Sequence, residues 1–122
     1  MSVSRISKES ILKMMRGDVT VDDETLCVVK FYSNGCHLCH ALSSYYIDIS
    51  DSYDDVLFFA YNVDDDGEIS EKLNLNGVPS VASFKISRGK RAKIANLKDP
   101  ETPNEKTWFT SRQIKNFIDK EK

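Results

Sequence analysis

Two cysteines, Cys36 and Cys39, stand three residues apart, just after an apolar run and at the start of a stretch without Pro or Gly. At the N-terminus of a helix, thiols at this spacing lie close enough to form a disulfide. Unpaired backbone N–H groups and the positive end of the helix dipole favour the thiolate of the first cysteine there. A thiolate attacks another disulfide, and the second thiol then resolves the mixed disulfide. The spacing therefore predicts thiol–disulfide exchange.

The elements on either side of the pair strengthen this prediction. Residues 26–32 are mostly β-branched and aromatic, and their nearly continuous apolarity predicts a central strand buried on both faces. From Cys36 to about Tyr53, apolar residues recur at helical spacing, which predicts a long helix. A pair of cysteines placed between a strand and a helix is a much stronger indication of redox chemistry than the spacing alone.

The rest of the chain supplies the other elements of the predicted fold. They are a helix at 8–16 that begins after Ser4 or Ser7 and ends at Gly17, a strand at 56–63, a short helix at about 69–75, two hairpin strands at 80–87 and 91–97, a polar loop at 98–107, and a final helix capped by Thr110 or Ser111. This order predicts an α/β fold in which helices cover both faces of a mixed central β-sheet. We expect residues 1–122 to form a single domain.

Composition narrows the class of protein. The chain has 122 residues and a net charge of −2, which argues against nucleic acid as the main partner. No apolar stretch approaches the roughly 18 residues of a membrane span, and the first ten residues lack the apolar core of a secretory signal. Three cysteines are too few for a disulfide scaffold. Cys27, which lies in the apolar strand at 26–32, is predicted to be a small core residue. We expect a cytoplasmic protein without a membrane partner.

The near-neutral total hides two charged stretches. Residues 48–71 hold nine acidic side chains and no basic one, whereas residues 85–98 hold six basic side chains and no acidic one. They form either solvated surfaces or a charge dipole that orients a partner protein. We expect both to lie away from the reactive end of the sheet.

Three segments in this order resemble the thioredoxin family: Val28–Cys39, Tyr61–Asp64 and Gly77–Ser80. The resemblance covers roughly residues 8–97 and the last helix, and it implies the thioredoxin fold. It also implies a protein dithiol–disulfide oxidoreductase that needs no cofactor and no metal. Its partners would be protein disulfide substrates and a reductase that recycles it, and the chain would act as a monomer.

The resemblance also implies individual roles. Cys36 would be the attacking nucleophile and Cys39 the resolving thiol. Pro79 would be a cis-proline beside the disulfide, since only an X–Pro bond adopts the cis form at low cost. The backbone of Val78, together with Pro79 and His37, would contact the substrate.

The sequence departs from the family pattern around the cysteines. Gly35 replaces the usual tryptophan, and His37-Leu38 replaces Gly-Pro. The family's buried carboxylate would fall at Lys30 and its partner lysine at Ala60. A protonated His37 would stabilise the Cys36 thiolate and make the pair more oxidising. Lys30 either adds to this effect, if its ammonium approaches a sulfur, or extends along a sheet edge toward water.

Other functions stay open at this point. Cys36, His37, Cys39 and His40 are potential metal ligands, although two adjacent pairs on one helical turn fit a tetrahedral site poorly, and His40 is expected at the surface. Residues 62–73 resemble a calcium loop but end in leucine where glutamate is required.

A glutaredoxin-like enzyme is the nearest enzymatic alternative. The roughly 25 residues that precede the first buried strand of this chain argue against it. The non-enzymatic alternative is an interaction module in which Tyr32, Val78 and the face around Cys36 form a docking patch.

Overall fold

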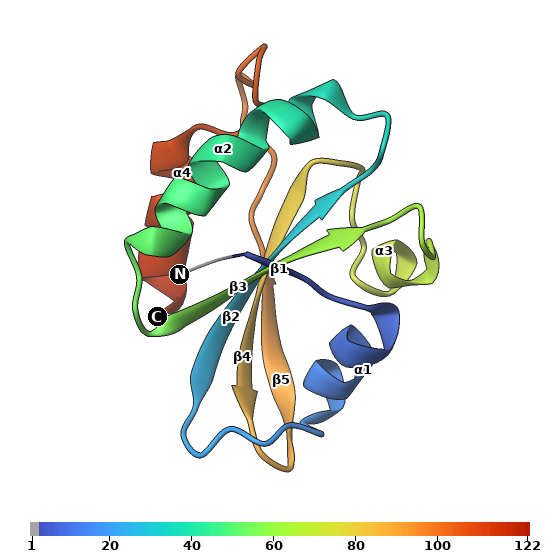
Figure 1. Ribbon diagram of the computed structural model, residues 1–122, viewed down its shortest axis with the longest axis vertical. Helices are drawn as coiled ribbons and strands as arrows, with labels where there is room; N and C mark the ends of the chain where they lie inside the picture. Colours follow the sequence, from blue (N-terminus) through green and yellow to red (C-terminus); the bar gives the residue numbers. More distant parts are fainter. Residues whose placement is uncertain (1–2) are drawn as a thin grey trace.

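The computed structural model describes residues 3–122, and over this range it contains a five-stranded sheet and four helices (Figure 1). In chain order the elements are β1 (Ser4–Arg5), α1 (Lys8–Arg16), β2 (Thr25–Tyr32), α2 (His37–Asp51), β3 (Val56–Asn62), α3 (Glu68–Lys72), β4 (Ser80–Ser87), β5 (Lys90–Asn96) and α4 (Ser111–Glu121). The predicted helices and strands are all present, with ends that shift by a few residues. Within residues 3–122, no helix is both long and apolar enough to cross a membrane.

Strand β2 is the centre of the sheet, whose strand order is β1-β3-β2-β4-β5. It pairs in parallel with β3 and antiparallel with β4, so the sheet is mixed. Side chains of β2 alternate between two apolar clusters: Cys27, Val29 and Phe31 point into one, and Leu26 and Val28 into the other. The predicted burial of this strand on both faces is confirmed.

Helices cover both faces of the sheet, as predicted (Figure 1). Ile11 of α1 and Ile69 of α3 belong to the first cluster. Leu42 of α2 and Ile114 of α4 belong to the second. Because each helix contributes an apolar stripe to a strand surface that is already apolar, burial of these stripes holds the layers together.

The edge strand β1 was not predicted. It pairs in parallel with β3 through Ser4 and Arg5 alone, and the Ile6 amide then donates to the Ala60 carbonyl at 2.9 Å. Two polar residues carry no alternating pattern, so the sequence gives no sign of a strand there. This short strand brings the beginning of the described chain alongside β3.

The end of α1 depends on a glycine. Gly17 closes the helix with φ +83°, and a Cβ placed on it would lie 2.0 Å from the Lys90 carbonyl oxygen. Its carbonyl also accepts a hydrogen bond from the Gly89 amide. Gly17 therefore allows the backbone of α1 to lie directly against the β4–β5 turn.

Replacing these two glycines separates backbone strain from a steric clash. Gly89 also has a positive φ, +75°, but a Cβ there meets nothing within 4 Å. We expect Gly89→Ala to lower the free energy of unfolding by about 1 kcal/mol through strain alone. Gly17→Ala adds overlap with backbone atoms and should cost at least about 3 kcal/mol. Urea unfolding of both variants measures the difference, and equal losses would contradict the close approach at Gly17.

Candidate active site

Cys36 and Cys39 lie at the carboxyl end of β2, where the chain enters α2. They are joined by a disulfide, with their Cα atoms 5.2 Å apart. Cys36 is the N-cap of α2, and its Sγ accepts a hydrogen bond from the Cys39 amide at 3.1 Å. Cys36 is half-buried, whereas Cys39 is fully buried. Only the first sulfur of the pair is therefore placed to meet a large substrate.

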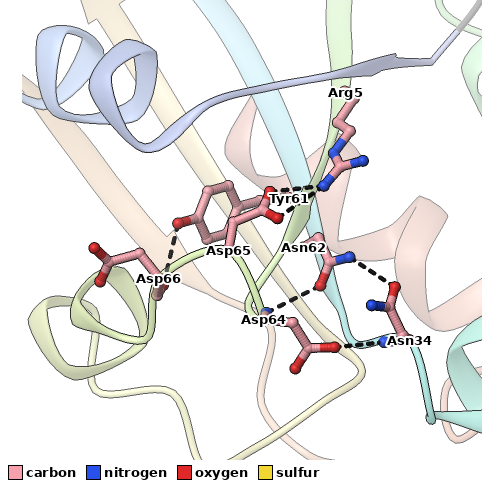
Figure 2. Close-up of polar contacts among 7 residues, drawn as sticks. All are labelled: Arg5, Asn34, Tyr61, Asn62, Asp64, Asp65 and Asp66. Atoms are coloured by element: carbon pink, nitrogen blue, oxygen red, sulfur yellow. Dashed lines mark hydrogen bonds and ion pairs between the residues drawn. The ribbon is translucent and has the colours of Figure 1, made fainter.

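The loop before Cys36 is held by hydrogen bonds to the end of β3 (Figure 2). The Asn34 amide donates to Asp64 Oδ2 at 2.9 Å, and Asn62 Nδ2 donates to Asn34 Oδ1 at 2.8 Å. The Asp64 amide in turn donates to Asn62 Oδ1 at 2.9 Å. On the helix side, His40 Nε2 lies 2.9 Å from the Asn34 carbonyl oxygen. These contacts fix the loop that carries the reactive cysteine.

The position of Asp64 corrects one expectation from the sequence. The acidic stretch was expected away from the reactive end of the sheet, but its 64–66 turn lies beside the active-site loop. The reason is topological: β2 and β3 are parallel, so the turns that follow them meet at the same edge of the sheet. The sequence shows the charges but not which strands are neighbours.

The carboxylates of this turn are engaged with the protein. Besides Asp64, Asp65 accepts hydrogen bonds on both carboxylate oxygens from Nη2 of Arg5 (Figure 2). Asp66 pairs with Lys8 Nζ at 2.8 Å. The Lys8 ammonium holds the pKa of Asp66 below its usual range. Through the contacts of Asp65 with Arg5 and of Asp66 with Lys8, the turn joins β1 and α1 to the end of β3. In residues 3–122 no group of three or more His, Cys, Asp or Glu side chains is arranged to hold a metal ion.

The Val78–Pro79 peptide bond is cis, and Pro79 is buried while Val78 is half-buried. Ser80, the next residue, is the register partner of Phe31 at the carboxyl end of β2. The cis-proline segment therefore lies at the same end of the sheet as the cysteine pair. Strand pairing therefore brings two sequence-predicted site residues, Val78 and Pro79, to the end of the sheet that carries Cys36, more than forty positions earlier in the chain.

The sequence profile named Thioredoxin matches residues 12–105 of this chain. The chain belongs to the thioredoxin family. The family resemblance and the thioredoxin fold expected from the sequence are confirmed.

Individual relatives agree with this assignment. Thioredoxin 1 of Plasmodium falciparum (isolate 3D7) is 26% identical over 68 residues, which make up 56% of this chain and 65% of that protein. The solution structure of oxidised thioredoxin from Plasmodium falciparum matches with a TM-score of 0.67 and 20% identity over 98% of both chains. The crystal structure of the ferredoxin:thioredoxin reductase and thioredoxin f2 complex contains a chain that matches with a TM-score of 0.71 and 16% identity, over 98% of this chain and 94% of that one.

Two departures from the thioredoxin pattern, Gly35 and His37, leave the surface around the reactive cysteine open to solvent. A Cβ placed on Gly35 meets nothing within 4 Å, so there is free space just before the reactive cysteine. His37, on the first turn of α2, is exposed, and its imidazole forms no hydrogen bond or ion pair with any described residue. His40 is exposed as expected, although its ring contacts the Asn34 carbonyl. The side chain of His37 is thus free to contact a bound polypeptide.

The third departure, Lys30, is buried. Its side chain is 5% exposed in the central strand, and Nζ donates to Ser43 Oγ at 2.7 Å, while the Ser43 hydroxyl donates to the Cys39 carbonyl at 3.2 Å. Burial lowers the pKa of Lys30 to about 8. The burial of Lys30 contradicts the alternative in which its side chain extends along a sheet edge toward water. The other alternative, an ammonium that stabilises the thiolate, stays a prediction, since the one hydrogen bond of the amine goes to Ser43. It reaches the cysteine pair only through a serine that the sequence analysis did not select.

Cys27 accounts for the odd number of cysteines. It is fully buried in β2, and desolvation raises the pKa of its thiol to about 12. The prediction that it is a core residue is confirmed. A thiol so rarely ionised is a poor nucleophile, so the reactive chemistry is confined to the other two cysteines.

The buried amine of Lys30 predicts an unusual dependence of stability on pH. Its pKa is about 8 in the folded state and 10.5 ordinarily, so between these values the unfolded state binds more protons and stability rises with pH. Relative to Lys30→Met, the wild type should gain up to about 3 kcal/mol between pH 8 and pH 10.5, with Lys30→Met the more stable protein at pH 7. Urea unfolding across this range tests it, and a constant difference between the two proteins would contradict the burial of the charge.

Proposed function

We propose that this thioredoxin-family protein is a dithiol–disulfide oxidoreductase that acts on protein disulfides. One observation carries the proposal: the sulfur of Cys36 caps α2 at the carboxyl end of the central strand and is bonded to the buried Cys39. A half-exposed sulfur at a helix N-terminus is an activated nucleophile when reduced. A buried partner three residues away is protected from substrates but reaches the first sulfur.

The exchange runs in two balanced steps. In the reduced protein the Cys36 thiolate attacks one sulfur of a substrate disulfide, forming a mixed disulfide and releasing the other substrate sulfur as a thiolate. Cys39, after losing its proton, attacks Cys36 and releases the second substrate thiolate. The protein is left with the Cys36–Cys39 disulfide, and the substrate has gained two electrons. The reverse sequence oxidises a substrate dithiol.

The residues proposed to hold the substrate are His37, Val78 and Pro79. Val78 is half-buried at the end of the sheet that carries Cys36, and His37 is exposed on the adjacent helix turn. A polypeptide passing between them would place its disulfide over the half-exposed sulfur. Contacts from two different elements at this end of the sheet suit an extended substrate.

A protein that reduces disulfides must itself be reduced again, so we propose a reductase as the second partner. The crystal structure of thioredoxin f2 in complex with ferredoxin:thioredoxin reductase supports a partner of this class, without identifying the one used here. We propose that the protein works as a monomer in the cytoplasm, where the pair is kept reduced between turnovers.

Trapping the mixed disulfide tests the activity. With Cys39→Ser, the second step is blocked, and we expect covalent adducts with several proteins that dithiothreitol releases. Cys36→Ser should form no adduct and should not reduce insulin disulfides, and Cys27→Ser, the matched control, should behave as the wild type. Absence of both adducts and insulin reduction in folded wild-type protein would favour an interaction module with no redox turnover.

We expect the pair to be less reducing than a typical thioredoxin, whose potential is about −270 mV. A positive charge on His37 next to the nucleophile and the buried Lys30 ammonium would both stabilise negative charge on the thiolates, and thus the reduced form. The contribution of Lys30 should be full at pH 7 and fade as the pH rises through about 8, where the amine loses its proton. Equilibration with glutathione buffers measures the potential of the wild type, Lys30→Met and His37→Gln. A wild-type value at or below that of thioredoxin contradicts the expectation.

A further inference from the structure

Lys30 is a buried cation without a buried anion. In the part of the chain that the structure describes, it forms no ion pair, and its one hydrogen bond goes to the neutral hydroxyl of Ser43. Its amine otherwise lies 5.6 Å and 5.2 Å from the ring centroids of Tyr32 and Tyr46. Buried charges in proteins are normally paired, because removing a lone ion from water costs several kcal/mol. A missing counter-ion is therefore the main feature to explain.

The amine belongs to a pocket of about 290 Å³ that lies beside the active-site loop. Val3, Ile47 and Ala60 supply apolar walls, and Lys30, Ser43 and His40 supply polar groups. Ala60 is the register partner of Lys30 on β3, so the small alanine leaves space next to the lysine. The volume and the mixed lining suit a short aliphatic chain that ends in an anion.

The titratable groups around Lys30 supply no negative charge of their own. From α2, His40 and Tyr46 face the pocket, and from β2, Tyr32 does; no Asp or Glu lines it among residues 3–122. Desolvation raises the pKa of Tyr46, so that phenol stays neutral. The Tyr46 hydroxyl is also occupied, since it donates to the carbonyls of Val28 and Phe59. The anion must come from outside this lining.

We propose that this pocket binds a carboxylate carried on a short aliphatic stem, with the carboxylate at the Lys30 amine and the Ser43 hydroxyl and the stem against Val3, Ile47 and Ala60. Two sources share this chemistry: a free small acid and a glutamate side chain of a bound polypeptide. The second source is within reach of a substrate, because His40 stands four residues, or about 6 Å, along α2 from Cys36. In that case the pocket deepens the proposed function by selecting substrates with an acidic residue near their disulfide.

Binding of sodium butyrate tests the pocket without any reference to redox activity. We expect saturable NMR shift changes at Tyr32, His40 and Ser43 and a higher pKa of Lys30 with butyrate, but no such changes with the uncharged butyramide at equal ionic strength. Lys30→Met should weaken butyrate binding at least about tenfold, the loss expected for one charge-assisted contact. Equal responses to butyrate and butyramide, or unchanged binding by folded Lys30→Met, would overturn the proposal.

Two variants of Ala60 keep the lysine and change the space beside it. Ala60→Asp places a carboxylate opposite Lys30, so it should raise the lysine pKa and abolish butyrate binding. Ala60→Leu fills the apolar part of the pocket and should abolish binding without raising that pKa. Butyrate bound equally well by either folded variant would place the ligand elsewhere and refute the assignment.

The source of the carboxylate is distinguished with two disulfide peptides that differ only in Glu or Gln beside the cystine. If the glutamate comes from substrate, the KM of the Glu peptide should be about tenfold lower, and Lys30→Met should remove the difference. Equal KM values together with butyrate binding would assign the pocket to a free acid. This arm rests on the proposed function, and reduction of neither peptide would count against that function while the butyrate result stands on its own.

Discussion

The site depends on strand β2 being paired on both sides along most of its length. Parallel pairing with β3 brings the 62–66 turn next to the loop at 33–35, and antiparallel pairing with β4 brings the cis-proline to the same edge. An apolar strand buried on both faces has no freedom to change its register, because a shift by one residue would turn every side chain to the opposite face. The position of the reactive sulfur is therefore set by the interior of the sheet, and the loop that carries it needs only a few hydrogen bonds.

The residues with chemistry and the main elements could be predicted, because each leaves a local pattern. Cys36 and Cys39 have a recognisable spacing, β2 is a run of apolar residues, and Pro79 belongs to a family motif. What could not be predicted depends on neighbours distant in the sequence. The two-residue β1 carries no periodicity, and the contact between Asp64 and the active-site loop arises only from parallel pairing. Such contacts are properties of the sheet order, which the local pattern does not contain.

Lys30 shows how far a single position can be interpreted from sequence. The residue type marked a departure from the family. The surroundings of the Lys30 amine, however, depend on the side chains that α2 packs against β2. In the structure Ser43, on α2, accepts the hydrogen bond, and Tyr46 of the same helix covers the side chain. The packing of α2 thus gives the amine a hydroxyl partner on the helix that carries the cysteines. An influence of this cation on the cysteines would be electrostatic and would act through the protein interior, where charges are screened less than at the surface.

The empty space at Gly35 has a consequence for how this protein can change. A side chain there projects into solvent before the reactive cysteine, and no buried contact has to be rebuilt to accommodate it. Most positions near an active site couple folding to function, so that a substitution which alters one also damages the other. Position 35 is free of that coupling. It is a point where natural variation or laboratory selection can narrow the entrance to Cys36 while the thioredoxin fold beneath it stays intact.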